Sequence, residues 1–149
     1  MLIRNILEES VRKFDEVKAV KWLNKKEIME RSYGELMENV VSTRKGLLAE
    51  GFEGKHIALI GTSSVEWMES YLGIITGCTT AVPLDAALPC EDLIDLLNRS
   101  DSVALFLSPK LRPYLDAFLE NCPKLQKVWM LQEEVEDAPA KVYLSLIHI

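Results

Sequence analysis

Blocks of apolar and polar residues alternate along positions 55–85, and they predict a strand, a helix and a second strand. The run HIALI at 56–60 is continuously apolar, which is typical of a parallel strand covered on both faces. A second apolar run, TTAVPL, follows at 79–84 after one helical pattern. Such a strand–helix–strand unit almost always forms a right-handed crossover between parallel strands. The sequence therefore predicts a parallel sheet at the centre of the protein.

The helix between these two runs has signals for its start and its end. Ser63, with Glu66 three positions later, predicts a capping box, and Gly77 is expected to end the helix in the left-handed conformation. Gly73 is expected to permit a close approach of the helix to the sheet. The apolar face is predicted from residues spaced three and four apart, namely Met68, Tyr71, Leu72 and Ile75.

The first part of the chain predicts a short helix and a β-hairpin. Residues 3–14 form an amphipathic segment whose apolar stripe consists of Ile3, Ile6, Leu7 and Val11. Two short β runs follow at 19–23 and 27–32, and the Asn-Lys-Lys sequence at 24–26 is the predicted turn between them.

A longer helix is predicted after the hairpin. Ser32 and Glu35 have the spacing of a capping box, and the helix is expected to run to about residue 50. Gly51 is the expected stop signal. The predicted core stripe of this helix is Leu36, Val40, Leu47 and Leu48.

Helical and strand patterns continue to alternate after residue 85. Pro89 stands near the first turn of a helix, and 103–107 is another apolar strand. The residues of this helix predicted to be buried are Leu93, Leu96 and Leu97.

The last helix is predicted to begin at Pro109 with Ser108 as its cap, and Pro123 is expected to end it. Its predicted apolar face consists of Leu111, Tyr114, Leu115, Phe118 and Leu119. A fourth strand is predicted at 125–131, and the acidic stretch at 132–141 is a predicted loop. Together these patterns predict an α/β fold, with an open, mostly parallel sheet and helices on both faces, preceded by a short helix and a β-hairpin.

The last six residues, LSLIHI at 144–149, do not resemble the end of a protein domain. They can be back-translated to CTGTCTCTTATACACATC, which matches the end sequence of a widely used transposase library adapter. We therefore expect 1–143 to be an incomplete subdomain of a larger fold, and 144–149 to be a non-native tail derived from adapter DNA. The alternative is a natural short β tail.

Composition narrows the class of protein. The formal net charge of −6 argues against a nucleic-acid partner, because such surfaces need clustered Lys and Arg. No apolar run is long enough to span a bilayer, and a cytoplasmic location is expected. Three widely spaced cysteines predict neither a disulfide framework nor a metal site, and they are expected to be small buried hydrophobes: Cys78, Cys90 and Cys122.

Catalytic patterns are absent, because neither GxGxxG nor GxxxxGK[ST] occurs and His56 is the only histidine outside the tail. The nearest approach to a phosphate loop is the turn at 61–64, whose Thr62, Ser63 and Ser64 precede a helix N-terminus. An ordinary capped turn is the favoured explanation of these hydroxyls. The carboxylates of Glu66, Glu69 and Asp85 could supply an acid–base pair. For Glu66 and Glu69, however, exposure on a helix surface is the favoured interpretation.

Four motifs in register nevertheless resemble those of adenylate-forming enzymes, the superfamily of acyl-CoA synthetases, adenylation domains of peptide synthetases and luciferases. RSYGEL at 31–36 is similar to the (T/S)Y-x-E-L signature, and GIITGCTTAVPLD at 73–85 resembles the G-x-x-x-G-x-x-x-V-P-[LI]-[DN] signature. Between them, GFEGKHIA at 51–58 resembles the lead into a strand, with Lys55 where Asp is usual, and SVEW at 64–67 resembles the start of the next helix.

This resemblance covers about residues 1–135 and implies the N-terminal part of a ligase. The parent enzyme would convert a carboxylic acid and ATP, with Mg²⁺, to an acyl-adenylate and pyrophosphate, and then transfer the acyl group to a thiol such as CoA. In that family the phosphate loop and the catalytic lysine lie further downstream. The present chain is therefore expected to carry no catalytic or metal-binding residue and not to bind ATP tightly. Thr62, Ser63 and Ser64 are the only candidates for ligand contact.

Two other interpretations remain open on the sequence. The chain could be a free-standing flavodoxin-like binding or regulatory module, with its ligand at the carboxyl ends of the strands. It could also be a non-catalytic partner subunit of an adenylating enzyme. For the ligase itself, fatty, aromatic and amino acids are all compatible substrates.

Overall fold

The computed structural model of the chain describes residues 2–131 and 142–143, and it centres on a parallel sheet. The strand order is β4-β3-β5-β6-β7, and every neighbouring pair is parallel. Continuous apolar runs form β3 and β5 because these strands are covered on both faces. The strand bounds are His56–Ile60 (β3), Thr80–Leu84 (β4), Ser102–Leu107 (β5), Lys127–Met130 (β6) and Val142–Tyr143 (β7).

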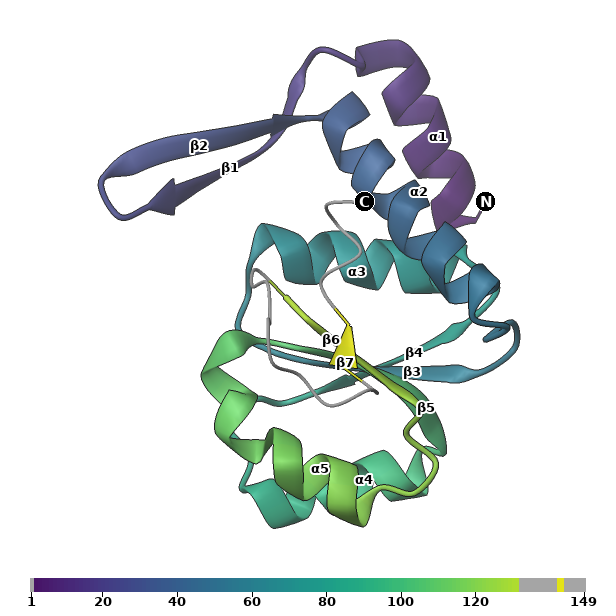
Figure 1. The fold of residues 1–149 in the computed structure, drawn as a ribbon. Coiled ribbons are helices and arrows are strands. Elements are labelled where there is room, and N and C mark those ends of the chain that lie inside the picture. Colours follow the sequence, from purple (N-terminus) through teal and green to yellow (C-terminus); the bar gives the residue numbers. More distant parts are fainter. Residues whose placement is uncertain (1, 132–141, 144–149) are drawn as a thin grey trace.

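Helices cover both faces of this sheet, as Figure 1 shows. On one face lies α3, with α2 packed on it, and on the other face lie α4, η1 and α5. Among the residues that the structure describes, no helix is long and apolar enough to cross a membrane. The predicted fold class is confirmed. The helix bounds are Tyr33–Ala49 (α2), Val65–Thr76 (α3), Cys90–Arg99 (α4), Pro109–Tyr114 (η1, a 3-10 helix) and Leu115–Asn121 (α5).

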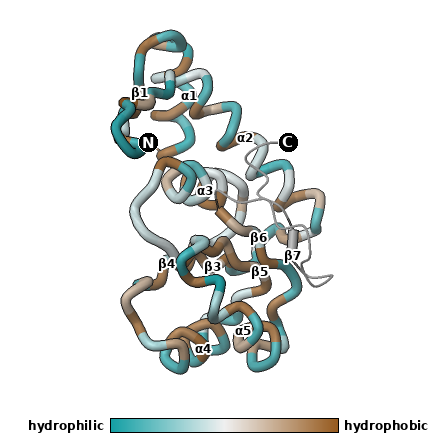
Figure 2. The backbone as a smooth tube through the Cα atoms, turned by 60° about the vertical axis from the view of Figure 1, so that its left-hand side comes forward, coloured by the Kyte–Doolittle hydropathy of each residue, from teal (hydrophilic) through white to brown (hydrophobic). Residues whose placement is uncertain are grey.

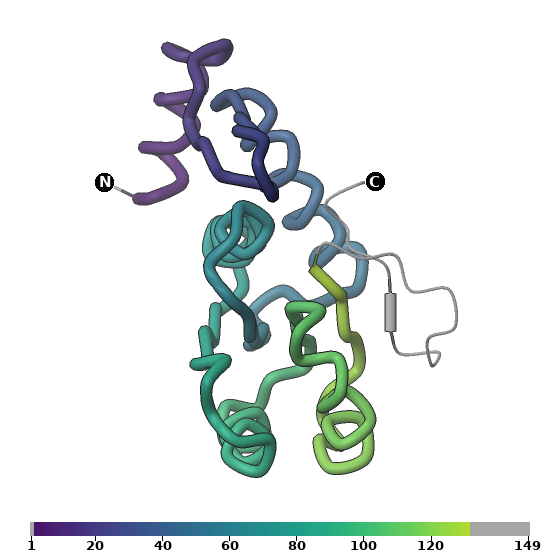
Figure 3. The backbone as a smooth tube through the Cα atoms, turned by 90° about the vertical axis from the view of Figure 1, so that its left-hand side faces the viewer, coloured from purple at the N-terminus to yellow at the C-terminus, as the bar shows by residue number. Residues whose placement is uncertain are grey.

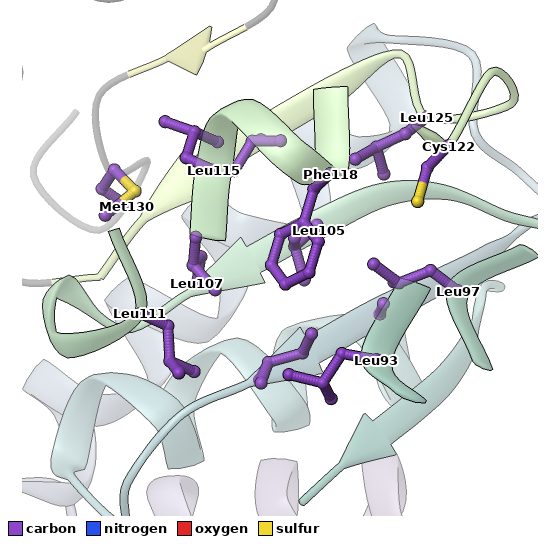
Figure 4. Close-up of a cluster of buried hydrophobic side chains, with 13 residues drawn as sticks. Leu93, Leu97, Leu105, Leu107, Leu111, Leu115, Phe118, Cys122, Leu125 and Met130 are labelled. Atoms are coloured by element: carbon purple, nitrogen blue, oxygen red, sulfur yellow. The ribbon is translucent and has the colours of Figure 1, made fainter. Parts of the chain in front are cut away.

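The hydrophobic core has one part on each face of the sheet. Along β3, Ala58 and Ile60 belong to the cluster with α4 and α5, whereas Ile57 and Leu59 belong to the cluster on the α3 side. Successive side chains of a strand point to opposite faces, so four consecutive buried residues contribute to both clusters. Figure 2 shows hydrophobic segments gathered on the strands between the helix layers, and Figure 4 shows the first cluster, in which Phe118 is fully buried.

The N-terminal elements lie beside α2, on the side of α3 that faces away from the sheet (Figure 3). They are α1 (Ile3–Phe14) and a hairpin of β1 (Lys18–Asn24) and β2 (Glu27–Ser32). The predicted helix and hairpin are thus confirmed, and Lys25 provides the left-handed residue of the turn with a φ of +56°. No residue of α1 is fully buried, so its apolar stripe is only partly covered.

The helix boundaries test the predicted caps. The capping box of α2 is confirmed, because Glu35 N donates to Ser32 Oγ at 3.2 Å and Ser32 N donates to Glu35 Oε2 at 2.7 Å. Gly51 has a φ of +74°, as a helix stop requires. The cap predicted at Ser63 is wrong, because the Ser64 side chain accepts the bond from Trp67 N at 3.1 Å.

The end of α3 also differs from the prediction. Gly77 has a φ of −101°, and the left-handed residue is Cys78, with a φ of +62°. Gly77 is needed for a steric reason instead, because a Cβ there would lie 2.7 Å from the carbonyl oxygen of Gly73. Glycine is therefore favoured at position 77 because a side chain would have no room there, and not because the backbone has a positive φ.

Pro113 divides the last predicted helix into two. Because proline lacks the N–H that an α-helix needs, the segment before it forms the 3-10 helix η1 and only the segment after it is α-helical. Ser108 precedes this segment, but its side chain makes no capping hydrogen bond, so that predicted cap is wrong. The strand predicted at 125–131 is shorter, spanning Lys127–Met130. The predicted loop at 132–141 and tail at 144–149 lie outside the described residues.

The predicted apolar faces of α3 and α2 are partly wrong. In α3 the four residues of the predicted face are only half-buried, and the fully buried positions are Val65, Glu69, Ser70, Gly73, Ile74 and Thr76. In α2 Leu48 is 44% exposed, whereas Thr43 is fully buried. Both differences arise because the two helices pack on each other through a stripe of small and polar residues. In α4, the predicted Leu96 is half-buried, while Leu93 and Leu97 are buried as predicted.

Gly73 lies at the centre of this helix–helix contact. A Cβ at Gly73 would lie 2.5 Å from Thr43 Cβ and 3.2 Å from the carbonyl oxygen of Val40. Neither atom is the end of a flexible side chain, so the helices would have to separate. The close approach predicted for Gly73 therefore exists, but it is to α2 and not to the sheet.

We expect Gly73→Ala to lower the free energy of unfolding by about 1–3 kcal/mol, because overpacking outweighs the better helix propensity of Ala. Urea unfolding followed by circular dichroism measures the change. Lys45→Ala, at an exposed position of α2, is the control and should change stability by less than about 0.5 kcal/mol. Unchanged stability of Gly73→Ala would contradict a tight α2–α3 contact.

Candidate functional site

The carboxyl ends of the parallel strands form the edge where ligands bind in open α/β sheets. At this edge a pocket of about 440 Å³ lies between the loop after β3 and the loop after β4. Its lining residues are Gly61, Thr62, Ser63, Leu84, Asp85, Ala86 and Ala87. The fold therefore places two of the three predicted ligand-contact residues, Thr62 and Ser63, at the expected edge.

A tight contact between two strand ends positions this loop. The backbone N–H of Ser108, after β5, donates to the carbonyl oxygen of Ile60 at 2.9 Å. A Cβ at Gly61 would overlap Ser108 Oγ, so only glycine permits this approach. The chain then leaves the sheet through Thr62 and Ser63, both exposed, before α3 begins.

The three predicted hydroxyls have different roles. Thr62 and Ser63 line the pocket, whereas Ser64 is not among its lining residues and caps α3 through the backbone N–H of Trp67. Thr62 and Ser63 therefore lie at the pocket, and Ser64 has a structural role.

Asp85, which the sequence offered only as a possible member of an acid–base pair, lines the same pocket. Its carboxylate Oδ1 accepts a hydrogen bond from Ala87 N at 2.9 Å, which holds the turn after β4. The sequence placed Asp85 directly after a strand, and this position predicts a place at the carboxyl edge. Its proximity to the β3 loop follows from the pairing of β3 with β4, which places Ile60 opposite Leu84.

The charge of this pocket does not suit a polyphosphate. Among the residues that the structure describes, the lining includes one carboxylate, from Asp85, and no Lys or Arg. The N-terminus of α3 favours an anion, but the Asp85 carboxylate opposes one. The described residues therefore do not fit the phosphates of ATP on their own.

A second pocket, of about 460 Å³, lies at the opposite edge of the sheet, where the strands begin. Three of its polar side chains have partners: Lys124 pairs with Asp101, and His56 Nδ1 lies 2.6 Å from the carbonyl oxygen of Ser100. The hydrogen bond from Lys124 lowers the pKa of Asp101 below its ordinary value. These contacts hold the amino-terminal edge of the sheet together, opposite the carboxyl edge where open α/β sheets bind ligands.

Neither a metal site nor a disulfide is formed by the residues that the structure describes. No group of three or more His, Cys, Asp or Glu residues in these ranges could hold a metal ion. Cys122 is buried and Cys90 half-buried, as expected for small hydrophobes. Cys78 is exposed, so the prediction that it is buried is wrong.

A buried carboxylate, Glu69, connects the hairpin, α2 and α3. It is fully buried, so its assignment to an exposed helix surface is wrong. Arg31 Nη1 lies 2.5 Å from Glu69 Oε1 and 2.7 Å from Oε2, and Asn39 Nδ2 donates to Oε1 at 3.0 Å. The guanidinium of Arg31 also lies over the ring of Trp22, 5.4 Å from its centroid.

Burial raises the pKa of Glu69, and the hydrogen bonds from Asn39 and Arg31 partly offset this rise. Glu69 is buried, its three partners Arg31, Asn39 and Trp22 are half-buried, and none of the four lines the pocket at the carboxyl edge. The cluster thus joins three elements and is not a catalytic acid–base pair.

The chain matches the AMP-binding enzyme family model over residues 7–145. A sequence search of curated proteins found no match. Among solved structures, coronafacic acid ligase from Pectobacterium brasiliense is similar, with a TM-score of 0.89 and 20% identity over 100% of this chain and 30% of that chain.

Two other solved structures share the fold. The N-terminal domain of FACL13 from Mycobacterium tuberculosis has a TM-score of 0.78 and 18% identity, covering 94% of this chain and 38% of that chain. The anthranilate CoA ligase AuaEII, solved with anthranoyl-AMP, has a TM-score of 0.76 and 19% identity, covering 85% of this chain and 24% of that chain. The chain thus spans 24% to 38% of the length of these three structures.

We expect Arg31→Met to lower the free energy of unfolding by about 3 kcal/mol at about pH 7, because it leaves the Glu69 charge buried without its cation. Loss of Arg31 raises the pKa of Glu69 further. Lowering the pH towards about 5 therefore lets Glu69 bind a proton and removes the unpaired charge, so the loss should be smaller there. Urea unfolding at the two pH values measures this difference.

Lys21→Met is the matched control. It breaks the ion pair between Lys21 and Glu30, whose side chains are 63% and 35% exposed, and should cost less than about 1 kcal/mol at either pH. Equal losses for Arg31→Met at both pH values would contradict the charge explanation and would favour lost packing on Trp22.

Proposed function

The chain belongs to the AMP-binding enzyme family, and we propose that it is the N-terminal part of an adenylate-forming acid–thiol ligase. The observation that carries this proposal is the family match over residues 7–145, which includes both signature-like stretches at 31–36 and 73–85. The chain has the same fold as solved ligases while spanning only 24% to 38% of their length.

In the proposed parent reaction, a carboxylate oxygen attacks the α-phosphorus of ATP and pyrophosphate leaves. A thiol sulfur, from CoA, then attacks the acyl carbon and AMP leaves. Mg²⁺ would balance the phosphate charge. Coronafacic acid ligase and anthranilate CoA ligase are named for carboxylic acid substrates, which supports a small carboxylic acid for this protein too. We propose a cytoplasmic enzyme, in line with three cysteines that form no disulfide.

The role proposed for the described residues is to form one wall of the ligand site. Thr62 and Ser63 present hydroxyls at the carboxyl edge, and Ser64 holds the loop by capping α3. The Asp85 carboxylate in the same pocket would repel phosphate, so the cationic groups for the nucleotide must come from other parts of the parent.

Reading the gene beyond codon 143 tests the proposal. We expect the DNA, re-amplified from its source, to continue in frame into a Ser/Thr/Gly-rich loop ending in Pro-Lys-Gly. A stop codon directly after natural codons for LSLIHI would overturn the ligase assignment. The chain would then be a free-standing binding module or a partner subunit.

We also expect the 149-residue chain to catalyse no ATP–pyrophosphate exchange above a buffer blank, and its melting temperature to stay constant with MgATP. The reason is that, in the described part of the chain, no Lys or Arg lines the pocket at the carboxyl edge. The complete enzyme, assayed in parallel with a panel of carboxylic acids, is the positive control. Exchange by the isolated chain would contradict this account of the pocket.

A further inference from the structure

The pocket at the amino-terminal edge of the sheet is built by three segments, each of which leads into a strand. Its lining residues come from 54–56 at the start of β3, from 101–103 at the start of β5 and from 123–126 directly before β6. These three strands are neighbours in the sheet. The backbone N–H of Gln126 donates to the carbonyl oxygen of Val103 at 2.7 Å, which joins two of the segments. The sheet itself therefore fixes the walls of this pocket.

The charge of this pocket is opposite in sign to that of the pocket at the carboxyl edge. Its lining carries two ammonium groups, from Lys55 and Lys124, against one carboxylate, from Asp101. The chain as a whole is acidic, with a formal net charge of −6, but charges more than about 10 Å away are largely screened at ordinary salt concentrations. The amino-terminal pocket therefore favours an anion.

Two polar side chains of this pocket are available to a ligand. Lys124 already pairs with Asp101, and His56 Nδ1 is bonded to a backbone carbonyl oxygen. Lys55 and Gln126 are exposed, and their side chains make no hydrogen bond or ion pair within the described ranges 2–131 and 142–143. Their ammonium and amide groups can therefore donate to a ligand without breaking an existing bond.

We infer that this pocket binds a phosphate group, either free in solution or as part of a small metabolite. Phosphate presents several oxygen acceptors in a tetrahedral arrangement, so donors from separate segments can each reach a different oxygen, and lysine is a common phosphate ligand. A carboxylate presents only two oxygens in one plane. The pocket volume of about 460 Å³ is in the range of small-molecule sites and leaves room for further atoms beside Val103 and Pro123.

This inference does not rest on the proposed function. The pocket lies at the edge of the sheet opposite Thr62 and Ser63, so its ligand would take no part in the proposed adenylation. Lys55 also stands where Asp is usual in the motif that 51–58 resembles, so the positive charge is a departure of this chain from that motif. In MgATP the metal ion already holds oxygens of the terminal phosphates, so MgATP is not the ligand expected here.

Equilibrium dialysis with radiolabelled inorganic phosphate, and with glycerol phosphate, tests the inference on the product of the re-amplified gene, whatever its length. We expect a saturable site whose affinity falls at least about tenfold in Lys55→Asp, because the variant reverses a charge in the lining. Gln126→Glu, which adds a negative charge in another segment, should weaken the same binding. Lys26→Asp makes the same charge change in the exposed hairpin turn and should leave the affinity within about twofold.

The melting temperature provides a second measurement on the same proteins. Phosphate should raise it for the natural sequence and raise it less for Lys55→Asp, because a ligand stabilises the folded state that binds it. Without ligand, the variants should melt together with the natural protein, since the exchanged side chains are exposed and the substituted Lys55 and Gln126 have no partner among the described residues to lose.

The two probes distinguish the sources of the phosphate group. Tighter binding of glycerol phosphate would identify a phosphorylated metabolite as the ligand, and otherwise free phosphate is the ligand. An absence of saturable binding, or displacement by acetate at the same concentration as phosphate, would overturn the inference. Binding that Lys55→Asp leaves unchanged would assign the phosphate to another site and would overturn it too. The ligase assignment is decided separately, by the DNA sequence beyond codon 143.

Discussion

The fully buried Glu69 is the constraint on which the arrangement of the N-terminal elements depends. A carboxylate without solvent must be neutralised or bonded on all sides, because the desolvation of a charge costs several kcal/mol. Its partners come from the end of β2, through Arg31, and from α2, through Asn39. Only one placement of the hairpin relative to α2 and α3 satisfies all of these bonds. An apolar contact would tolerate sliding, but this cluster does not, and so the hairpin has a defined direction.

The same helix shows why burial does not follow hydrophobicity alone. The most buried face of α3 carries Glu69, Ser70, Gly73 and Thr76, because α2 packs on this face at short range. The hydroxyls of Thr43 and Ser70 are buried there without a hydrogen-bond partner among the described residues. Close backbone approach and the bonds to Glu69 offset this cost. Periodicity therefore misplaced the buried face of α3: the four apolar residues that it selected are only half-buried.

The parts of the fold that the sequence predicts are those determined by neighbours along the chain. Apolar runs predicted the strands β3 to β6, and the Ser32–Glu35 spacing predicted a real capping box. Ser63 and Ser64 are equally good caps by chemistry, and the choice between them depends on where the strand end is anchored by Ser108. In the candidate site, Thr62 and Ser63 were predicted from the hydroxyl-rich turn between a strand and a helix N-terminus. The presence of Asp85 beside them depends on the β3–β4 register, which a single sequence does not provide.

The charge of the pocket at the carboxyl edge limits what this part of an adenylating enzyme could contribute to binding a nucleotide. Hydroxyls and a helix N-terminus can orient a ligand, but they add little positive potential, and Asp85 reduces it further. A triphosphate bound here would keep several negative charges near a carboxylate unless cations came from elsewhere. The described residues are thus suited to shape one wall of a site and to hold it rigidly, through the Gly61–Ser108 contact. Electrostatic stabilisation of the reacting phosphate, which usually makes the largest contribution to such catalysis, requires groups from beyond this sheet.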